Sequence, residues 1–141
     1  MERNPFVGTW RLMSLEMRRP DGQVGYPLGR DPVGYITYTE DGYMSVAMMS
    51  AGRPKFTAGD IRRGTVAEKT VAADTYVSYC GRYEIRNDRI IHHLAVSFFP
   101  NWIGTEQERV FKFDGSRLSL CSSPFLADGV QQTVHLIWER V

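Results

Sequence analysis

The segment GRYEIRNDRIIHHLAV, residues 81–96, has the pattern of two β-strands joined by a tight turn. A two-residue turn at 87–88 pairs Tyr83 with His92 across the hairpin. Side chains alternate between the two faces of a strand, so His92 and His93 point in opposite directions. His92 shares its face with apolar and aromatic residues, whereas His93 falls in a more polar row. We therefore expect His92 inside the protein and His93 outside it; a longer turn would change the partners but not the separation of the two rows.

Strand signals of this kind recur along the whole chain. They fall at residues 7–17, 33–39, 43–50, 78–86, 89–98, 105–113, 117–122 and 131–140, with a weaker one near 23–27. Tight-turn signals separate many of them, and three of the four turns contain the Asp-Gly pair that is typical of hairpins. These features predict an all-β fold, a closed up-and-down antiparallel barrel of eight or nine strands. The length and the absence of repeats or linkers predict that residues 1–141 form a single domain.

One stretch departs from the strand pattern. Thr65, followed by Glu68 three residues later, has the spacing of a helix capping box. We expect a helix over about residues 66–77 that lies across the barrel or over its mouth.

Composition narrows the classes of partner. The formal net charge is +1 and the charges are spread along the chain, so a nucleic acid is not expected. No apolar run has the length of a membrane span or a signal peptide, which predicts a cytoplasmic protein without membrane contact.

Cys80 and Cys121 are then expected to be reduced thiols. The chain has no CxxC, no HExxH and no other spacing typical of metal ligands, so we expect no metal and no cofactor; a homodimer stays open.

The hairpin near residue 114 places a charged residue on the apolar side. A turn at Asp114 and Gly115 pairs Phe111 with Leu118, and in the same register it puts Arg109 opposite Leu120. A buried guanidinium needs a partner, because desolvating it alone costs several kcal/mol. An internal carboxylate such as that of Glu16 would make Arg109 structural, whereas an anionic ligand would make it an anchor.

Several stretches along the chain resemble a known family. The stretch VGTWRL, residues 7–12, is similar to the Gly-x-Trp opening of lipocalins, and WERV, residues 138–141, supplies an arginine expected to stack over Trp10. Longer stretches (DPVGYITYTEDGYMSV, YCGRYEI, IIHHLAVSFFPNWIGTEQER and LADG) resemble the lipocalin-like domain of small bacterial and fungal proteins. The resemblance implies a calyx-shaped barrel for small organic molecules. The chain departs from secreted lipocalins because it lacks the Thr-Asp-Tyr motif, the DTY at 74–76 being reordered.

Seven residues are candidates for the wall of the cavity. They are Tyr79, Tyr83, His92, Trp102, Arg109, Phe111 and Trp138, with His135 predicted to face outward. One hypothesis is a module that binds a small hydrophobic molecule in the barrel. The alternative is a cofactor-independent isomerase or cyclase, in which His92 transfers a proton with help from Tyr83 while Arg109 stabilises an oxyanion. His92 and Arg109 bonded to each other or to carboxylates would favour binding, whereas both approaching one ligand atom would favour catalysis.

Overall fold

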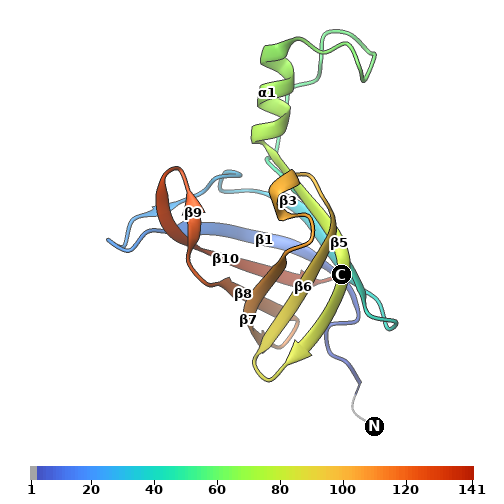
Figure 1. Ribbon diagram of the computed structural model, residues 1–141, viewed down its shortest axis with the longest axis vertical. Helices are drawn as coiled ribbons and strands as arrows, with labels where there is room; N and C mark the ends of the chain where they lie inside the picture. Colours follow the sequence, from blue (N-terminus) through green and yellow to red (C-terminus); the bar gives the residue numbers. More distant parts are fainter. Residues whose placement is uncertain (1–2) are drawn as a thin grey trace.

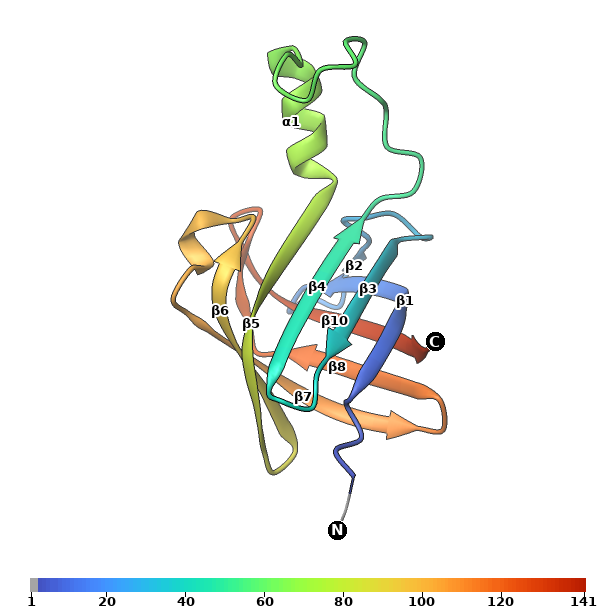
Figure 2. The ribbon, with the colours of Figure 1, turned by 90° about the vertical axis from the view of Figure 1, so that its right-hand side faces the viewer.

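The computed structural model describes residues 3–141, and eight of the strands in this part of the chain close a β-barrel (Figures 1 and 2). Neighbouring barrel strands follow chain order and run antiparallel, and pairing of the first with the last closes the sheet. The predicted all-β, up-and-down barrel is therefore confirmed. The barrel strands are β1 (Gly8–Arg18), β3 (Val33–Tyr38), β4 (Tyr43–Met49), β5 (Tyr76–Arg86), β6 (Arg89–Ser97), β7 (Glu106–Asp114), β8 (Arg117–Ser122) and β10 (Val130–Arg140).

Two short strands extend the sheet at the open end of the barrel. β2 (Val24–Gly25) pairs with the end of β1 and corresponds to the weak signal near 23–27. β9 (Phe125–Ala127) pairs with the start of β10 and was not predicted. Its three residues are too few to show an alternating pattern.

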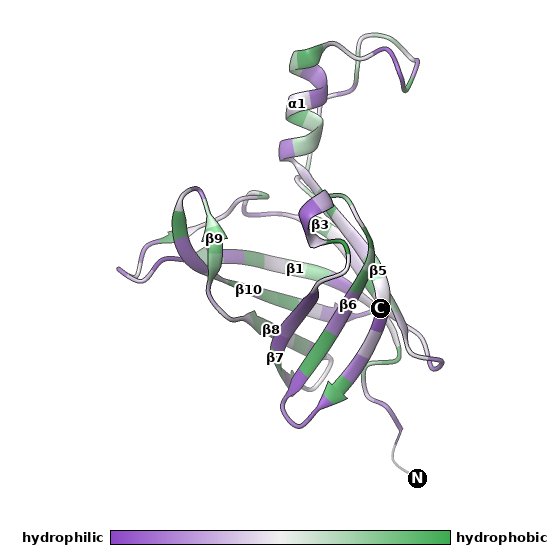
Figure 3. Cartoon of the chain, in the orientation of Figure 1, coloured by the Kyte–Doolittle hydropathy of each residue, from purple (hydrophilic) through white to green (hydrophobic). Residues whose placement is uncertain are grey.

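One end of the barrel is packed shut around Trp10. Its indole Nε1 donates a hydrogen bond to the carbonyl oxygen of Phe6 (2.9 Å). The guanidinium of Arg140 lies 4.1 Å from the ring centroid and also donates to the carbonyl oxygens of Pro5 and Val7. This confirms the expected stacking. Along β10, buried residues alternate with more exposed ones. The pattern is less regular along β6, where Figure 3 shows hydrophobic and hydrophilic bands.

The β5–β6 hairpin follows the predicted register near its turn and departs from it further along. Tyr83 pairs with His92, as expected, but a β-bulge at Cys80 and Gly81 makes Tyr79 pair with Ser97 instead of Val96. The bulge brings the backbones close together: a Cβ atom on Gly81 would lie 1.8 Å from the carbonyl oxygen of His93. The missing side chain of Gly81 is what permits this approach.

The predicted register of the β7–β8 hairpin was wrong by two residues. Asp114 pairs with Arg117, so the turn residues are Gly115 and Ser116, and Gly115 takes the positive φ (60°) that the turn requires. Arg109 consequently lies opposite Ser122 rather than Leu120, and Phe111 opposite Leu120 rather than Leu118. A shift of two residues keeps every side chain on its predicted face, because the period of a strand is two.

The helix α1 (Val66–Asp74) begins with the predicted capping box. The Thr65 hydroxyl accepts from the Glu68 backbone N–H (3.1 Å), and the Glu68 carboxylate accepts from that of Thr65 (2.9 Å). The helix ends three residues earlier than predicted, because Tyr76 already pairs with Met49 in the sheet.

The same helix stands beyond the open end of the barrel and rises away from the rim instead of lying across the mouth (Figures 1 and 2). None of its residues is buried, and Val66 and Val71 are exposed. Within residues 3–141, no helix has the length and apolar character needed to cross a membrane.

We predict that Gly81→Ala lowers the free energy of unfolding by at least about 1–3 kcal/mol, because the new methyl group would collide with the backbone of β6. Gly25→Ala is the matched control, since Gly25 is also in a strand and a Cβ there meets nothing within 4 Å. It should change stability by less than about 0.5 kcal/mol in urea unfolding. Equal losses in both variants would contradict the role assigned to the bulge.

Candidate functional site

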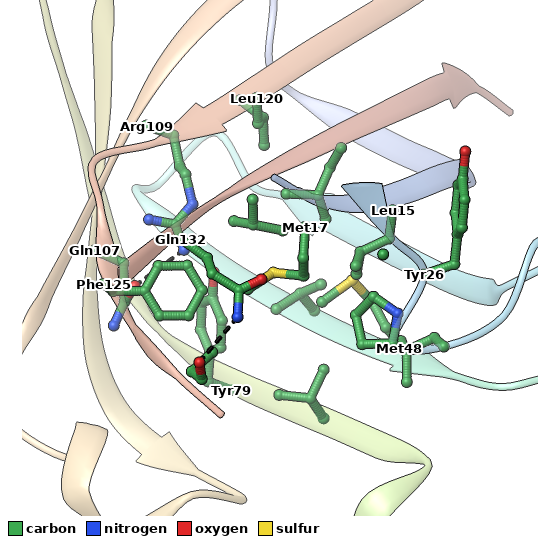
Figure 4. Close-up of a pocket in the computed structure, with 18 of the residues that line it drawn as sticks. Leu15, Met17, Tyr26, Met48, Tyr79, Gln107, Arg109, Leu120, Phe125 and Gln132 are labelled. Carbon is green, nitrogen blue, oxygen red and sulfur yellow. Dashed lines mark hydrogen bonds between the residues drawn. The ribbon is translucent and has the colours of Figure 1, made fainter. Parts of the chain in front are cut away.

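A cavity of about 620 Å³ occupies the half of the barrel next to the open end. Much of its wall is apolar, and polar groups gather on one side. Figure 4 shows Arg109, Gln107, Gln132 and Tyr79 close together, with Met17, Leu15 and Met48 further along. Representative apolar wall residues are Leu15, Ile36, Val46, Met48, Leu120 and Leu136.

His92 lies on the cavity wall but is almost fully enclosed, with 1% of its surface exposed. Both ring nitrogens have tyrosine partners: Nε2 lies 2.8 Å from the Tyr38 hydroxyl, and Nδ1 lies 3.0 Å from the Tyr79 hydroxyl. Burial, with smaller effects from the charges of Arg109 and His93, lowers the pKa of His92 to about 3. The imidazole is therefore neutral at ordinary pH.

The surroundings of Tyr38, His92 and Tyr79 decide which group donates in each of the two hydrogen bonds that link them. A neutral imidazole has one donor and one acceptor nitrogen. The Tyr38 hydroxyl is buried and, among the described residues, has Nε2 of His92 as its one hydrogen-bond partner, so we assign Nε2 as the acceptor of its proton. Nδ1–H then donates to the Tyr79 oxygen, and the Tyr79 O–H is left to donate toward the cavity. Burial raises the pKa of both Tyr38 and Tyr79, the nearby Arg109 charge offsetting part of the rise, so both keep their protons.

Tyr83 does not reach the cavity, although it pairs with His92 across the hairpin. Its hydroxyl donates to the carbonyl oxygen of Thr39 (2.6 Å) and accepts from the side-chain amide of Asn4 (2.9 Å). The partner that sequence reasoning missed is Tyr38. Alternation on its strand, with Ile36 and Tyr38 in one row, was the signal that could have found it.

Arg109 is half-buried and lines the cavity, and Glu16, one of the two kinds of partner considered for it, is not its partner. Its Nη1 donates to the carbonyl oxygen of Glu108 and its Nη2 to Oε1 of Gln107, both at 2.9 Å. Glu16 instead pairs with Arg18 at 3.0 Å. No ion pair between residues of the described chain includes Arg109.

The remaining aromatic candidates divide between the two ends of the barrel. Tyr79, Trp102 and Trp138 line the cavity. Phe111 does not, because its ring packs in the closed end, with its centroid 4.8 Å from that of Phe6. This packing uses the inward face predicted for Phe111 but at a different height in the barrel.

Two glutamines in the cavity wall were not predicted. Gln107 accepts the hydrogen bond from Arg109, and Gln132, only 5% exposed, donates through Nε2 to the carbonyl oxygen of Ala127 (2.9 Å). Both lie two residues along the strand from inward-facing neighbours, Arg109 and Val134. Extending the inward rows by one step would have found them.

The outer histidines take part in surface contacts. His93 lies 2.8 Å from Glu84 and 3.4 Å from Glu106, and its hydrogen bond lowers the pKa of Glu84. His135 contacts Cys121 and Thr133 on the outer face. The separation of His92 from His93 thus agrees with the alternation of β6. Among residues 3–141, no group of three or more His, Cys, Asp or Glu side chains has the arrangement of a metal site.

Comparison with known proteins gives three findings. A family model described as a lipocalin-like domain matches residues 7–141. The chain is 34% identical over 107 residues, 70% of its length and 96% of the relative, to a protein of Aspergillus oryzae named 4′-hydroxy-3′-methoxypropiophenone carrier protein. A crystal structure of a lipocalin-like protein from Bacteroides uniformis superposes with a TM-score of 0.51 at 13% identity, covering 98% of this chain and 100% of that one. At that identity the superposition shows the fold alone.

We predict that Tyr38→Phe destabilises the protein by about 1–3 kcal/mol, because a buried nitrogen of His92 loses its hydrogen bond. Tyr35→Phe on the same strand is the control, since Tyr35 is 51% exposed, and it should stay within about 0.5 kcal/mol of the parent. Urea unfolding measures both. A Tyr38→Phe variant as stable as the control would show that the hydrogen bond between Tyr38 and His92 contributes nothing to the stability of the protein.

The low pKa of His92 predicts a specific pH dependence. Between about pH 6.5 and 3 the unfolded chain takes up a proton at this position and the folded protein does not. The free energy of unfolding therefore falls as the pH falls, by up to about 1.4 kcal/mol per pH unit from this group. His92→Gln should lose this contribution in urea unfolding at several pH values, whereas His93→Gln should keep it. Identical slopes for His92→Gln and the parent would disprove a neutral, buried imidazole.

Proposed function

The chain belongs to the family of lipocalin-like domains, and from this premise we propose that it binds a small, largely apolar organic molecule in the barrel cavity. The observation that carries the proposal is the cavity itself. Its volume of about 620 Å³, its apolar wall and its few convergent polar groups are the usual properties of a site for a small molecule.

The ligand class that we propose is aromatic. Four aromatic side chains line the cavity toward its open end and offer flat apolar surfaces: Tyr26, Tyr76, Trp102 and Phe125. The name of the Aspergillus oryzae relative specifies an aryl ketone that carries hydroxyl and methoxy groups, and it calls that protein a carrier. A compact aromatic compound with one or two oxygen substituents fits both facts.

The arrangement of His92 favours binding over proton transfer. A general base works best when its pKa lies near the working pH, and the pKa of His92 is about 3. Both ring nitrogens already have tyrosine partners, and Tyr83, the helper expected for catalysis, is hydrogen-bonded outside the cavity. His92 instead fixes the orientation of Tyr79 at the cavity wall.

The binding function predicts different effects for two adjacent residues of β9. Ala127 lines the cavity, and Leu126 is 67% exposed. Ala127→Trp should fill part of the cavity and weaken binding of the fluorescent apolar probe N-phenylnaphthylamine by about tenfold or more. Leu126→Trp adds a similar side chain outside the cavity and should change the affinity by less than about threefold. A parent protein that leaves the fluorescence of the probe unchanged would refute the proposal.

A further inference from the structure

Arg109 is a cation on the wall of a mainly apolar cavity, and its protein contacts do not neutralise it. Two of its five N–H donors are used, and both acceptors are neutral: the Glu108 carbonyl and the Gln107 amide oxygen. A guanidinium removed from water without a carboxylate partner is costly. An anionic group placed beside it would recover part of that cost as a charge-assisted hydrogen bond.

The carboxylates near Arg109 are directed elsewhere. Glu108, the next residue on β7, pairs on the outer face with Arg89 at 3.3 Å. Asp74 and Asp128 line the cavity but are exposed, and neither forms an ion pair with Arg109 within the described chain. Among residues 3–141, therefore, no carboxylate forms an ion pair with this positive charge on the cavity wall.

Tyr79 adds a second donor on the same side of the cavity. In the assignment above, Nδ1–H of His92 donates to the Tyr79 oxygen, so the Tyr79 O–H is available to donate to a ligand. Gln132 shares this side (Figure 4), but one of its amide hydrogens is held by the carbonyl oxygen of Ala127. Arg109 and Tyr79 thus present hydrogen-bond donors to whatever lies between them, which suits an oxygen that only accepts.

We propose that the cavity selects ligands with an anionic oxygen, a carboxylate or an ionised phenol, which binds to the free N–H groups of Arg109 and the O–H of Tyr79. The apolar body of the ligand then extends along the wall that contains Met17, Leu15 and Met48. This inference rests on the proposed binding function and adds the charge of the ligand to it.

The test is a competition against N-phenylnaphthylamine at neutral pH between two molecules of nearly equal shape, para-butylbenzoate and para-butylacetophenone. The benzoate should displace the probe from the parent at a concentration at least tenfold lower than the ketone. Arg109→Gln should bring the two within about threefold, whereas Arg109→Lys keeps the charge and should keep most of the preference. Lys112→Gln is the matched control, because Lys112 is an exposed cation of the same strand, and it should retain the full preference. Using the ratio of two competitors corrects for any change in the affinity of the probe itself.

A second measurement distinguishes the two proposed kinds of anionic ligand, carboxylates and ionised phenols. The phenolate of para-hydroxybutyrophenone absorbs at longer wavelength than the phenol, so its ionisation can be followed while it is bound. The parent should lower the apparent pKa of the bound phenol, and Arg109→Gln should not. A benzoate preference without this shift assigns the site to carboxylates, and a shift without the preference assigns it to phenols.

Failure of the anion site and failure of the binding function give different results. If the probe binds but the benzoate and the ketone compete equally and the apparent pKa of the bound phenol is unchanged, the anion site is refuted and the binding function stands. Retention of the preference in Arg109→Gln would refute the role of Arg109. If the probe does not bind to the parent, the binding function fails and the anion site fails with it.

Discussion

The pairing of β1 with β10 is the interaction on which the rest of the structure depends. It joins the two ends of the chain through a backbone ladder from Trp10 and Arg140 to Arg18 and Thr133. Closure removes the unpaired edges that an open eight-stranded sheet would expose. It also sets Arg140 over Trp10 and so seals one end. Only a closed sheet has an interior, and both the aromatic core and the cavity exist because of it.

The interior is divided along the barrel axis, and this division sets the role of each inward-facing side chain. At the closed end, Phe6, Phe111 and Phe113 pack edge to face, and Tyr83 is held by hydrogen bonds. At the open end the same strands contribute Tyr79 and Arg109 to the cavity. Two residues of one strand face can thus belong to the core in one case and to the cavity wall in the other. Their height in the barrel makes the difference, and strand alternation carries no information about height.

The polar side of the cavity shows how burial controls chemistry. Burial keeps His92 neutral, and its two tyrosine partners turn it into an element that orients a hydroxyl group. The same surroundings leave Arg109 with neutral partners only. A neutral histidine beside an uncompensated cation makes a poor general base and a good environment for an acceptor oxygen. The family, the cavity and these contacts all support the proposed binding of a small molecule.

Local patterns in the sequence determined the eight barrel strands, most turns, the capping box and the face of most strand residues; the bulge in the β5–β6 hairpin turned Val96, which was expected inside, to the outer face. They sufficed to separate His92 from His93 and to place Arg109 inside, because alternation is a property of the backbone and survives a register error of two residues. Other features depended on the tertiary structure: the bulge at Gly81, the tyrosine partners of His92, the position of α1 and the lack, within residues 3–141, of an ion-pair partner for Arg109. Each of these depends on which strands lie side by side and at what height their residues meet. Such contacts join residues far apart in the chain, so only the closed barrel decides them.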